Sequence, residues 1–283
     1  YSAAFGGAGT FQNVFNRMVA DGVDVISNSW AYCENQTSQS DVDGIEAILQ
    51  SAAVAGISVF SGSGDTGSTC LDGAANTIGV PAGAPHITAV GGTSLVAGAG
   101  GVRQGETWWD GSDATPRTGQ GGFGTSRFFV RPAYQDGFNA SPMRSIPDVS
   151  IVADPASGFI ICQADAGGCP TGLMFGGTSM AAPVWASFAA LLNQAAGVNL
   201  GFANERFYPL ASTAAFHDAA SMGSDFAHVG LGSPDLGTLN LALRGASAGA
   251  VSADHSDILA TAPPVAPFTD NYGVPADGTS PGV

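Results

Sequence analysis

One serine lies where a helix is predicted to begin, and it has the chemistry of a nucleophile. It belongs to Gly176-Gly-Thr-Ser-Met-Ala-Ala-Pro183, a run of small residues that leads into a strongly apolar segment. This arrangement places Ser179 among the unpaired N–H groups at the positive end of a helix dipole, and these groups can also hold an oxyanion. Pro183 is expected in the first helical turn, where proline is tolerated. A helix cap without chemistry is the alternative.

A carboxylate follows one of the predicted strands. The sequence Ser61-Gly-Ser-Gly-Asp-Thr-Gly67 comes directly after the apolar run 57–60. Functional sites of parallel α/β sheets lie beyond the carboxyl ends of the strands, so Asp65 is expected where a site would be. An aspartate in an ordinary glycine-rich turn is the alternative.

The elements that must position these residues alternate between helix and strand. Apolar residues recur at helical spacing in two segments, each followed by a glycine, and a third, almost wholly apolar helix follows Gly177. The predicted helices are 11–19, 45–53 and 178–194, and the predicted strands are 23–27, 57–60, 87–90, 150–153 and 159–162. This order predicts an α/β fold with a mostly parallel sheet and crossover helices. The glycine-rich stretch 94–139 is predicted to form loops and short antiparallel strands.

The composition excludes several classes of protein. The chain has 283 residues with 45% hydrophobic and 11% charged residues, and all eight basic residues are arginine against 23 carboxylates, for a net charge of −15. The apolar fraction excludes general disorder, and the acidic balance argues against nucleic acid as a partner. No run of 18 apolar residues occurs, so no membrane span is expected.

Four cysteines occur, and they indicate disulfides rather than a metal site. They include no C-x-x-C pair, which makes zinc unlikely. Cys162 and Cys169 are close enough in sequence for a disulfide that closes a short loop, so two disulfides are expected. Four buried thiols are the alternative.

Several motifs in order resemble one known family. Gly177-Thr-Ser-Met-Ala-Ala-Pro resembles the nucleophile motif of subtilisin-like serine peptidases, and Ser-Gly-Asp at 63–65 resembles the sedolisins, the serine-carboxyl peptidases. Further segments resemble the same family in the family's order, over about residues 1 to 244. These segments are 25–34, 84–94, 146–150, 153–158 and 230–234.

The resemblance implies a subtilisin-like three-layer α/β fold and a catalytic site. Ser179 would attack the peptide carbonyl, and Asp65 would donate a hydrogen bond to the tetrahedral oxygen beside the N–H of Ser179. A carboxyl donates only while protonated, and its ordinary pKa is about 3.9, so this chemistry favours acidic pH or a desolvated site. The resemblance also implies substrate contacts at Ser29, Trp30 and Ala31, which would pair with the peptide as an added strand, and at Gly121 and Gly122 on the opposite wall.

The family's calcium site has a possible counterpart in Phe216–Asp225. The resemblance implies carboxylate ligands from Asp218 and Asp225 and carbonyl ligands from Ala219, Ser221 and Gly223, the oxygen donors that a hard cation requires. The segment between the two aspartates is shorter than the usual family loop. A polar surface loop is the alternative.

The family's base is missing from this sequence. Sedolisins activate the serine with a Glu and an Asp four residues apart on one helix, upstream of the segment that matches Tyr1 onward. No acidic pair here has that spacing in that place, so we expect the chain alone to be inactive and an upstream segment to supply the pair. An unpaired sheet edge or apolar groove near residues 1–30 is expected where that segment packs.

The sequence thus predicts a peptidase domain at 1–244, followed by a linker or the start of a further module at 245–283. The end of that stretch resembles the opening of bacterial immunoglobulin-like repeats. The expected activity is that of a monomeric, secreted, calcium-stabilised endopeptidase acting on proteins or peptides. The alternatives are a subtilisin-type enzyme, which needs an Asn at position 65 and a catalytic His, and an inactive peptidase-like binding or scaffold module.

Overall fold

The computed structural model describes residues 1–3, 9–162, 168 and 174–245. The chain divides into a unit at Tyr1–Ala250 and a second unit at Val251–Val283, and the second lies outside the described residues. The last described helix ends at Leu243. The predicted linker or module from 245 onward therefore stays a prediction.

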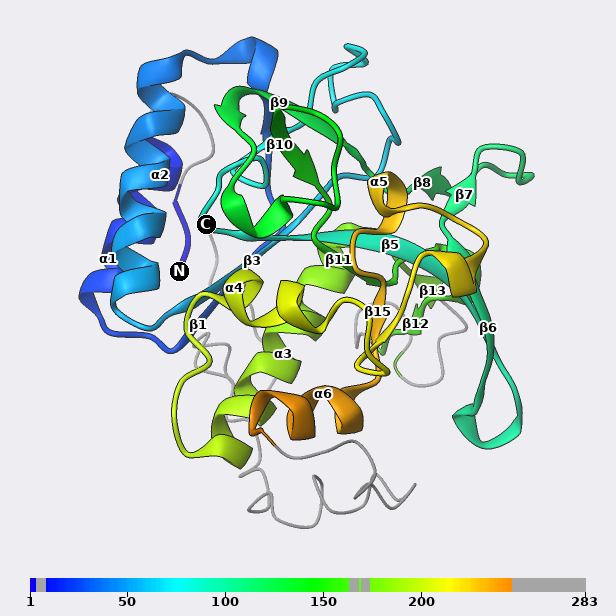
Figure 1. The fold of residues 1–283 in the computed structure, drawn as a ribbon. Helices are drawn as coiled ribbons and strands as arrows, with labels where there is room; N and C mark the ends of the chain where they lie inside the picture. The colour runs from blue at the N-terminus through cyan, green and yellow to red at the C-terminus, as the bar shows by residue number, and fades with distance from the viewer. Residues whose placement is uncertain (4–8, 163–167, 169–173, 246–283) are drawn as a thin grey trace. The chain divides into compact units, whose positions relative to one another are not determined.

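A mixed sheet forms the centre of the first unit (Figure 1). Four parallel strands lie in the order β1, β3, β5, β11, and β6 pairs antiparallel with β5. The strands are β1 (Val25–Asn28), β3 (Ser58–Gly62), β5 (Thr88–Ala97), β11 (Val149–Val152) and β6 (Arg103–Trp108). The predicted mostly parallel sheet is confirmed. Asn28 of β1 pairs with Ser61 of β3, so the carboxyl ends of these two strands lie side by side.

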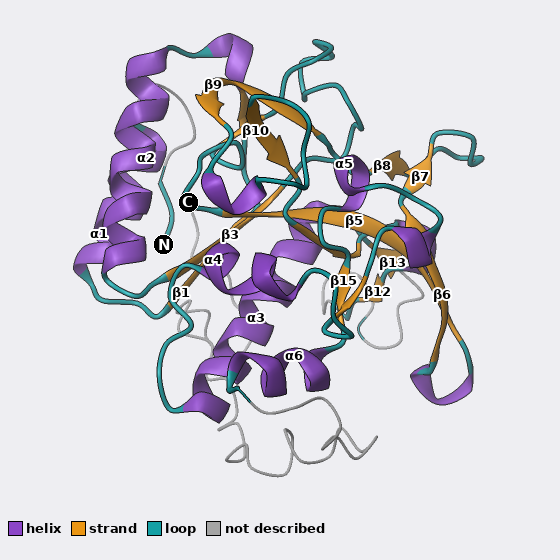
Figure 2. Cartoon of the chain, in the orientation of Figure 1, coloured by secondary structure: helices purple, strands orange, loops and turns teal. Residues whose placement is uncertain are grey.

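Helices cover both faces of this sheet (Figure 2). Two of them, α1 (Thr10–Ala20) and α2 (Gln39–Val54), lie next to each other on one face. The long α3 (Thr178–Ala196) packs on the other face and contacts α6 (Leu236–Leu243). Two short helices, α4 (Ala203–Phe207) and α5 (Phe226–Val229), complete the set in the described part of the chain.

Side chains of β3 alternate between two hydrophobic cores. Val59 packs with Ile45 and Leu49 in the cluster under α1 and α2. Phe60 belongs to the cluster under α3 and stacks on Trp185 with ring centroids 6.3 Å apart. Burial on both faces explains why the strand reads as a continuous apolar run rather than an alternating one.

Short antiparallel pairs surround the central sheet. They are β2 (Tyr32–Cys33) with β4 (Gly79–Val80), β7 (Asp110–Gly111) with β8 (Gly119–Gln120), β9 (Gly124–Val130) with β10 (Met143–Ile146), β12 (Phe159–Ile160) with β13 (Met174–Phe175), and β14 (Phe216–His217) with β15 (Ser233–Pro234). The short antiparallel strands predicted within 94–139 are therefore present.

Several predicted boundaries are wrong. The strand predicted at 87–90 continues to Ala97, because its second half pairs with β6 from Thr93 opposite Trp108 onward. The strand predicted at 159–162 ends at Ile160. The short helices α4, α5 and α6 were not predicted, since segments of four to eight residues carry too few turns to show helical periodicity.

A buried ion pair fixes the turn between β10 and β11. Arg144 and Asp148 are both fully buried, and the Arg144 guanidinium donates to both carboxylate oxygens at 2.8 and 2.5 Å. Asp148 also accepts hydrogen bonds from the Tyr208 hydroxyl at 2.8 Å and from the Ala89 N–H of β5 at 2.8 Å. Neighbouring donors thus satisfy this buried carboxylate and tie the turn to the sheet.

Disulfides occur as the sequence suggested. Cys33 and Cys70 are bonded, with their Cα atoms 5.8 Å apart. Cys162 is also disulfide-bonded, whereas Cys169, its expected partner, lies outside the described residues. The one cluster of metal-type ligands found in the described part of the chain consists of Cys33, Cys70 and Asp72, and its sulfurs are joined to each other.

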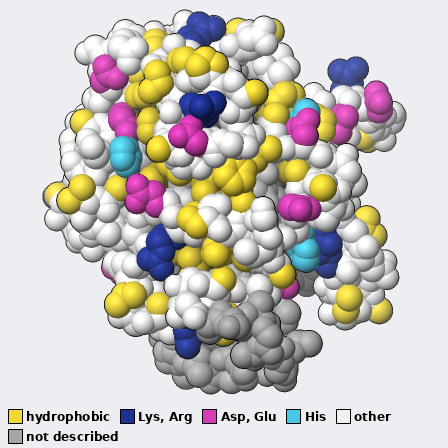
Figure 3. Space-filling model, viewed as in Figure 1, with side chains coloured by type: hydrophobic (Ala, Val, Ile, Leu, Met, Phe, Trp, Pro, Cys, Tyr) yellow, Lys and Arg dark blue, Asp and Glu magenta, His cyan; other side chains and the backbone are white. Residues whose placement is uncertain are grey.

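In the described part of the chain, no helix is both long enough and apolar enough to cross a bilayer. The basic side chains visible in Figure 3 are scattered over that face.

Candidate active site

The predicted nucleophile lies at the start of α3. Ser179 is exposed and is the second residue of the helix, so its N–H is among those that a helix leaves without an intrahelical acceptor. Gly177 precedes the helix with φ of 96°, and a Cβ there would lie 2.8 Å from Oδ2 of Asp65. Glycine is therefore required at 177 both by the backbone conformation and by the approach of the carboxylate.

Pro183 was placed wrongly from the sequence. It is the sixth residue of α3 and lies beyond the first turn. Because proline has no N–H, it cannot bond to the carbonyl four residues earlier, which is that of Ser179. The Ser29 hydroxyl donates to that carbonyl at 2.8 Å instead. Pro183 thus frees a backbone acceptor that links α3 to the segment after β1.

Thr178 holds Asp65 next to Ser179. The N–H and the hydroxyl of Thr178 both donate to Oδ1 of Asp65, at 2.7 and 2.8 Å. The Gly64 N–H donates to the Thr178 hydroxyl oxygen at 3.0 Å, so that hydroxyl keeps its own proton for the carboxylate. Since two donors point at Oδ1, a protonated Asp65 would carry its proton on Oδ2. Oδ2 is the oxygen that faces Gly177.

A cavity of about 70 Å³ connects the predicted site residues. Ser179, Asp65 and Thr178 line it on one side, and the segment Ser29–Ala31 lines another. The remaining wall comes from the loop after Asp65 and from β4 and its flank. The cavity thus brings together the serine, the carboxyl and three of the five predicted substrate residues.

Asn28 shapes the segment Ser29–Ala31. Its side-chain amide is buried and donates to the Trp30 carbonyl at 2.7 Å and to the Ser61 hydroxyl at 2.9 Å. Trp30 is 67% exposed and so does not belong to the core. The Ala31 methyl faces Gly79 of β4, which has no side chain to collide with it.

Gly121 and Gly122 lie behind the Asp65 loop and do not line the cavity. The Gly122 N–H donates to the Gly64 carbonyl at 2.7 Å, and the Gly122 carbonyl accepts from the Ser63 hydroxyl at 2.7 Å. A Cβ on Gly122 would lie 2.6 Å from the Ser63 carbonyl oxygen, so only glycine allows this contact. Their neighbour Phe123 lines the cavity instead. Direct substrate contact by the two glycines stays a prediction.

No base for Ser179 lies in the described part of this cavity. Its lining contains one carboxylate, Asp65, and no histidine. The Ser179 hydroxyl donates to the Ser29 carbonyl at 3.3 Å. The acidic residues nearest the start of the chain bind elsewhere: Asp21 pairs with Arg17, and Asp24 accepts from Asn199.

An apolar groove adjoins the cavity, as expected near residues 1–30. Its volume is about 480 Å³, and Ser29 and Trp30 line both hollows. Tyr1, the α1 side chains Phe11, Val14, Phe15 and Met18, and the end of β1 line the rest. Among the described strands β1 pairs with β3 alone, so its other edge is open. The predicted groove and unpaired edge are both present.

The predicted calcium loop is short and internally bonded. Asp218 accepts the Ser221 N–H on Oδ1 at 2.9 Å, and the Ala219 carbonyl accepts N–H groups at 222 and 224. Asp225 caps α5 and pairs with His228, with Oδ1 2.7 Å from the imidazole Nδ1. Partial burial opposes ionisation of Asp225, but the hydrogen bonds and the charge of His228 together with the backbone N–H bonds outweigh it, so the pKa of Asp225 is lowered. Each carboxylate is exposed and uses Oδ1 in these bonds.

Sequence reasoning missed four residues that build the site. Thr178, Asn28, Phe123 and Cys70 each position or line it. Thr178 directly precedes the nucleophile, so its place in the motif was a usable signal. Asn28 directly precedes the predicted segment Ser29–Ala31, so its position was a usable signal too. Phe123 and Cys70 reach the cavity only through the tertiary fold.

The sheet order and the placement of Ser179 define a subtilisin-like α/β fold. The chain belongs to the subtilase family, whose family model matches residues 5–215. Kumamolisin of Bacillus sp. (strain MN-32) is 32% identical over 216 residues, which make up 72% of this chain and 37% of kumamolisin. Sedolisin of Pseudomonas sp. (strain 101) is 30% identical over 242 residues, or 81% of this chain and 40% of sedolisin. The chain therefore spans less than half the length of these relatives.

Solved structures agree with this assignment. Pseudomonas sedolisin, a serine-carboxyl proteinase complexed with two molecules of pseudo-iodotyrostatin, matches with a TM-score of 0.72 and 27% identity, over 86% of this chain and 71% of that chain. The prenylagaramide maturation protease PagA matches with a TM-score of 0.50 and 16% identity, over 87% of this chain and 71% of that chain, and this likeness concerns the fold alone. The sequence-based recognition of a sedolisin-like, subtilisin-fold chain is confirmed.

Proposed function

We propose that this chain is part of a sedolisin-type serine endopeptidase that cleaves proteins or peptides through an acyl-enzyme. The carrying observation is the contact between Asp65 and Thr178, which holds a carboxyl beside the N–H and hydroxyl of Ser179. A subtilisin-type site would need an asparagine at 65 and a histidine base. The chain has an aspartate there, and no histidine lines the described cavity.

In the proposed reaction, the Ser179 Oγ forms a bond to the scissile carbonyl carbon and passes its proton to a base. The carbonyl oxygen becomes an oxyanion and accepts hydrogen bonds from the Ser179 N–H and from protonated Asp65 Oδ2. Collapse of this intermediate breaks the C–N bond, and the leaving amine takes the proton from the base. Water then releases the acyl group by the same steps in reverse order. Acidic pH favours this chemistry because Asp65 donates only when it holds a proton.

We propose that the base comes from a chain segment that occupies the groove beside β1. The groove shares Ser29 and Trp30 with the lining of the catalytic cavity, and β1 offers an edge unpaired among the described strands for a further strand. A segment paired there would end close to the Ser179 hydroxyl. On this proposal the 283-residue chain by itself does not turn over substrate.

We propose calcium as a structural ligand of the loop Asp218–Asp225. The donors are oxygens, as a hard cation requires, and the Oδ2 atoms of Asp218 and Asp225 are the ones outside the local Oδ1 bonds. The carbonyls of Ala219, Ser221 and Gly223 would complete the set. The ion would hold the loop closed and take no part in the reaction.

We propose a secreted, monomeric protein. The Cys33–Cys70 disulfide supports an oxidising compartment, where such bonds persist. The proposed partners are protein or peptide substrates, and neither nucleic acid nor a membrane is expected.

The deciding experiment is a peptidase assay from pH 3 to 7. It compares the 283-residue chain with the natural protein and with Ser179→Ala in the natural protein. We expect activity that rises toward acidic pH in the natural protein alone. Ser179-dependent activity of the 283-residue chain would disprove the proposal that the base comes from another segment. An inactive natural protein would disprove the proposed peptidase activity.

The inactive peptidase-like module is the second candidate. It is favoured by one observation, the hydrogen bond from the Ser179 hydroxyl to the Ser29 carbonyl in a cavity whose described lining holds no base. This candidate predicts peptide binding without cleavage in the natural protein at every pH tested.

A further inference from the structure

The loop that carries Asp65 has two halves with different anchors. The first half, Gly64–Gly67, is bonded to the chain around Gln120 and to Thr178: the Gln120 N–H donates to the Asp65 carbonyl at 3.0 Å, and the Gly67 N–H donates to the Gln120 carbonyl at 3.2 Å. These contacts hold the carboxyl. The second half joins the first at Thr66 and Thr69, whose hydroxyls donate to each other's carbonyl oxygens at 2.7 and 2.8 Å.

The second half, residues 68–76, forms the rim of the cavity and folds back on itself. We call it the rim loop. The Asn76 N–H donates to the Ser68 carbonyl at 3.1 Å, and the Cys70 N–H donates to the Ala74 carbonyl at 3.0 Å. The rim loop contributes Thr69, Cys70 and Leu71 to the cavity, and Leu71 is 63% exposed. These hydrogen bonds fix the conformation of the rim loop but do not attach it to the segment after β2.

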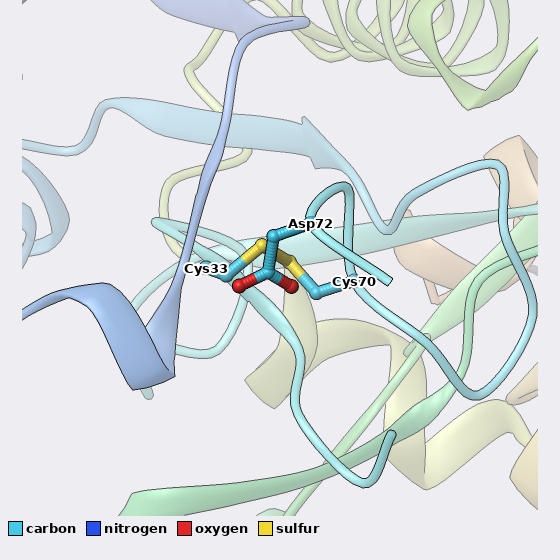
Figure 4. Close-up of side chains that lie close together, drawn as sticks. All are labelled: Cys33, Cys70 and Asp72. Carbon is cyan, nitrogen blue, oxygen red and sulfur yellow. A yellow bond between two sulfur atoms is a disulfide. The ribbon is translucent and has the colours of Figure 1, made fainter. Parts of the chain in front are cut away.

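Two links attach the rim loop to the segment after β2 (Figure 4). The disulfide joins Cys33 to Cys70, and the Asn35 side-chain amide donates to Asp72 Oδ2 at 2.8 Å. The Asn35–Asp72 link lies two residues after the disulfide in both segments. Figure 4 shows the Asp72 carboxylate beside the disulfide. Bonds from the Ala74 N–H and from Asn35 lower the pKa of Asp72.

The two links therefore connect two segments that both line one cavity. Cys33 comes two residues after Ala31 and Cys70 directly precedes Leu71, and both Ala31 and Leu71 line the cavity. We propose that Cys33–Cys70 and Asn35–Asp72 act together as a clamp that sets the cavity width, and so positions the substrate side chain next to the scissile bond. The clamp positions residues and takes no part in catalysis.

This inference rests on the proposed peptidase function, and it predicts a particular kinetic pattern. Asp65 and Ser179 keep their own anchors when the clamp is removed, so turnover should change little. The cavity walls, however, lose their fixed separation. We expect KM to rise about 10-fold or more for substrates with a large apolar side chain before the scissile bond, the scale of losing one or two methylene contacts. Substrates with alanine at that position should change less than about 2-fold, because they scarcely reach the rim.

The main test is the double variant Cys33→Ala/Cys70→Ala in the natural protein, with kcat and KM measured on matched large and alanine substrates. Asn35→Ala removes the polar link alone and should shift KM in the same direction by less. Asp72→Asn keeps an acceptor for Asn35 and should leave KM near the wild-type value. Leu49→Ala, in the core under α2, serves as a control for lowered stability and should leave the KM ratio unchanged. An equal loss of kcat on both substrates, or no change in either KM, would overturn the clamp.

Hydrogen exchange on the 283-residue chain tests the same idea without any activity. In the double variant, the N–H groups of Cys70, Gly73 and Asn76 should lose protection, whereas those of Gly67 and Gln120 should keep it. Equal protection throughout the loop, or equal loss in both halves, would contradict independent anchoring. This result stands even if the peptidase proposal fails, so the two failures can be told apart.

Discussion

Ser29 and Ser179 exchange hydrogen bonds between the end of β1 and the start of α3. The Ser29 hydroxyl donates to the Ser179 carbonyl at 2.8 Å, and the Ser179 hydroxyl donates to the Ser29 carbonyl at 3.3 Å. The first bond uses the acceptor that Pro183 leaves free in α3 and fixes the backbone of the proposed nucleophile. The second bond is long and exposed, so a base that arrives in the cavity can replace it at little cost.

Ser179→Ala in the natural protein should reduce turnover on the order of 10⁶-fold, because the proposed nucleophile is removed. Stability should change by no more than about 1 kcal/mol, the scale of losing a side-chain hydrogen bond at a helix start. Peptide hydrolysis and thermal unfolding measure the two effects. Ser187→Ala, further along α3 and also exposed, is the matched control and should keep full activity. Full activity in Ser179→Ala would end the assignment.

Asp65→Asn should lower turnover by about 10²- to 10³-fold, the scale of losing an oxyanion donor. An amide donates at any pH, so the remaining activity should extend to higher pH than in the wild type. The pH profile of kcat measures this shift. An unchanged rate and profile would make Asp65 an ordinary turn residue.

A chelator should lower the melting temperature of the 283-residue chain, and added calcium should restore it. An ion that binds only the folded state stabilises it by about 2.7 kcal/mol at 100 times its dissociation constant. Asp218→Asn and Asp225→Asn should each abolish the response, whereas Asp43→Asn on α2 should leave it intact. Identical melting of the wild type with and without chelator would exclude a stabilising calcium ion.

The pair His86–Glu46 should make stability depend on pH near neutrality. The hydrogen bond to Glu46 raises the pKa of His86 despite its partial burial, and Glu205 adds to the effect. Because the pKa of His86 is higher in the folded than in the unfolded chain, its protonation stabilises the fold. This contribution is complete below the unfolded pKa of about 6.5 and is lost as pH rises through the folded pKa.

At pH 5.5, Glu46→Gln should therefore have a lower free energy of unfolding than the wild type, by about 0.2–1 kcal/mol. This is the usual scale for a partly exposed ion pair. The difference should shrink by pH 8.5. Thermal unfolding across this range measures it. A difference that stays constant, or that grows with pH, would contradict the proposed sign.

Arg144→Met should destabilise the fold by about 3–5 kcal/mol, because it leaves the buried Asp148 carboxylate without its counter-charge. For a domain of this size the melting temperature should fall by about 10 °C. Arg17→Met removes an exposed pair with Asp21 and should cost less than about 1 kcal/mol. Equal melting of the two variants would show that the buried pair contributes no more than a surface one.

The sequence determined the order of the central elements and the two main site residues. Buried parallel strands and long helices carry their periodicity in the local sequence, so the helices predicted at 11–19, 45–53 and 178–194 correspond to α1, α2 and α3. The start of α2 at Gln39 was missed, because its first residues are polar. Ser179 and Asp65 were also foreseeable, because glycine-rich motifs after strands and before helices are local features.

Only the tertiary structure decided how those residues are held. Thr178 reaches Asp65 across 113 positions of sequence, and Ser29 reaches Ser179 across 150. The open edge of β1 and the disulfide across the cavity likewise depend on which strands become neighbours. Local propensity carries no information about such pairings, because their energy comes from burying both partners together once the sheet has formed.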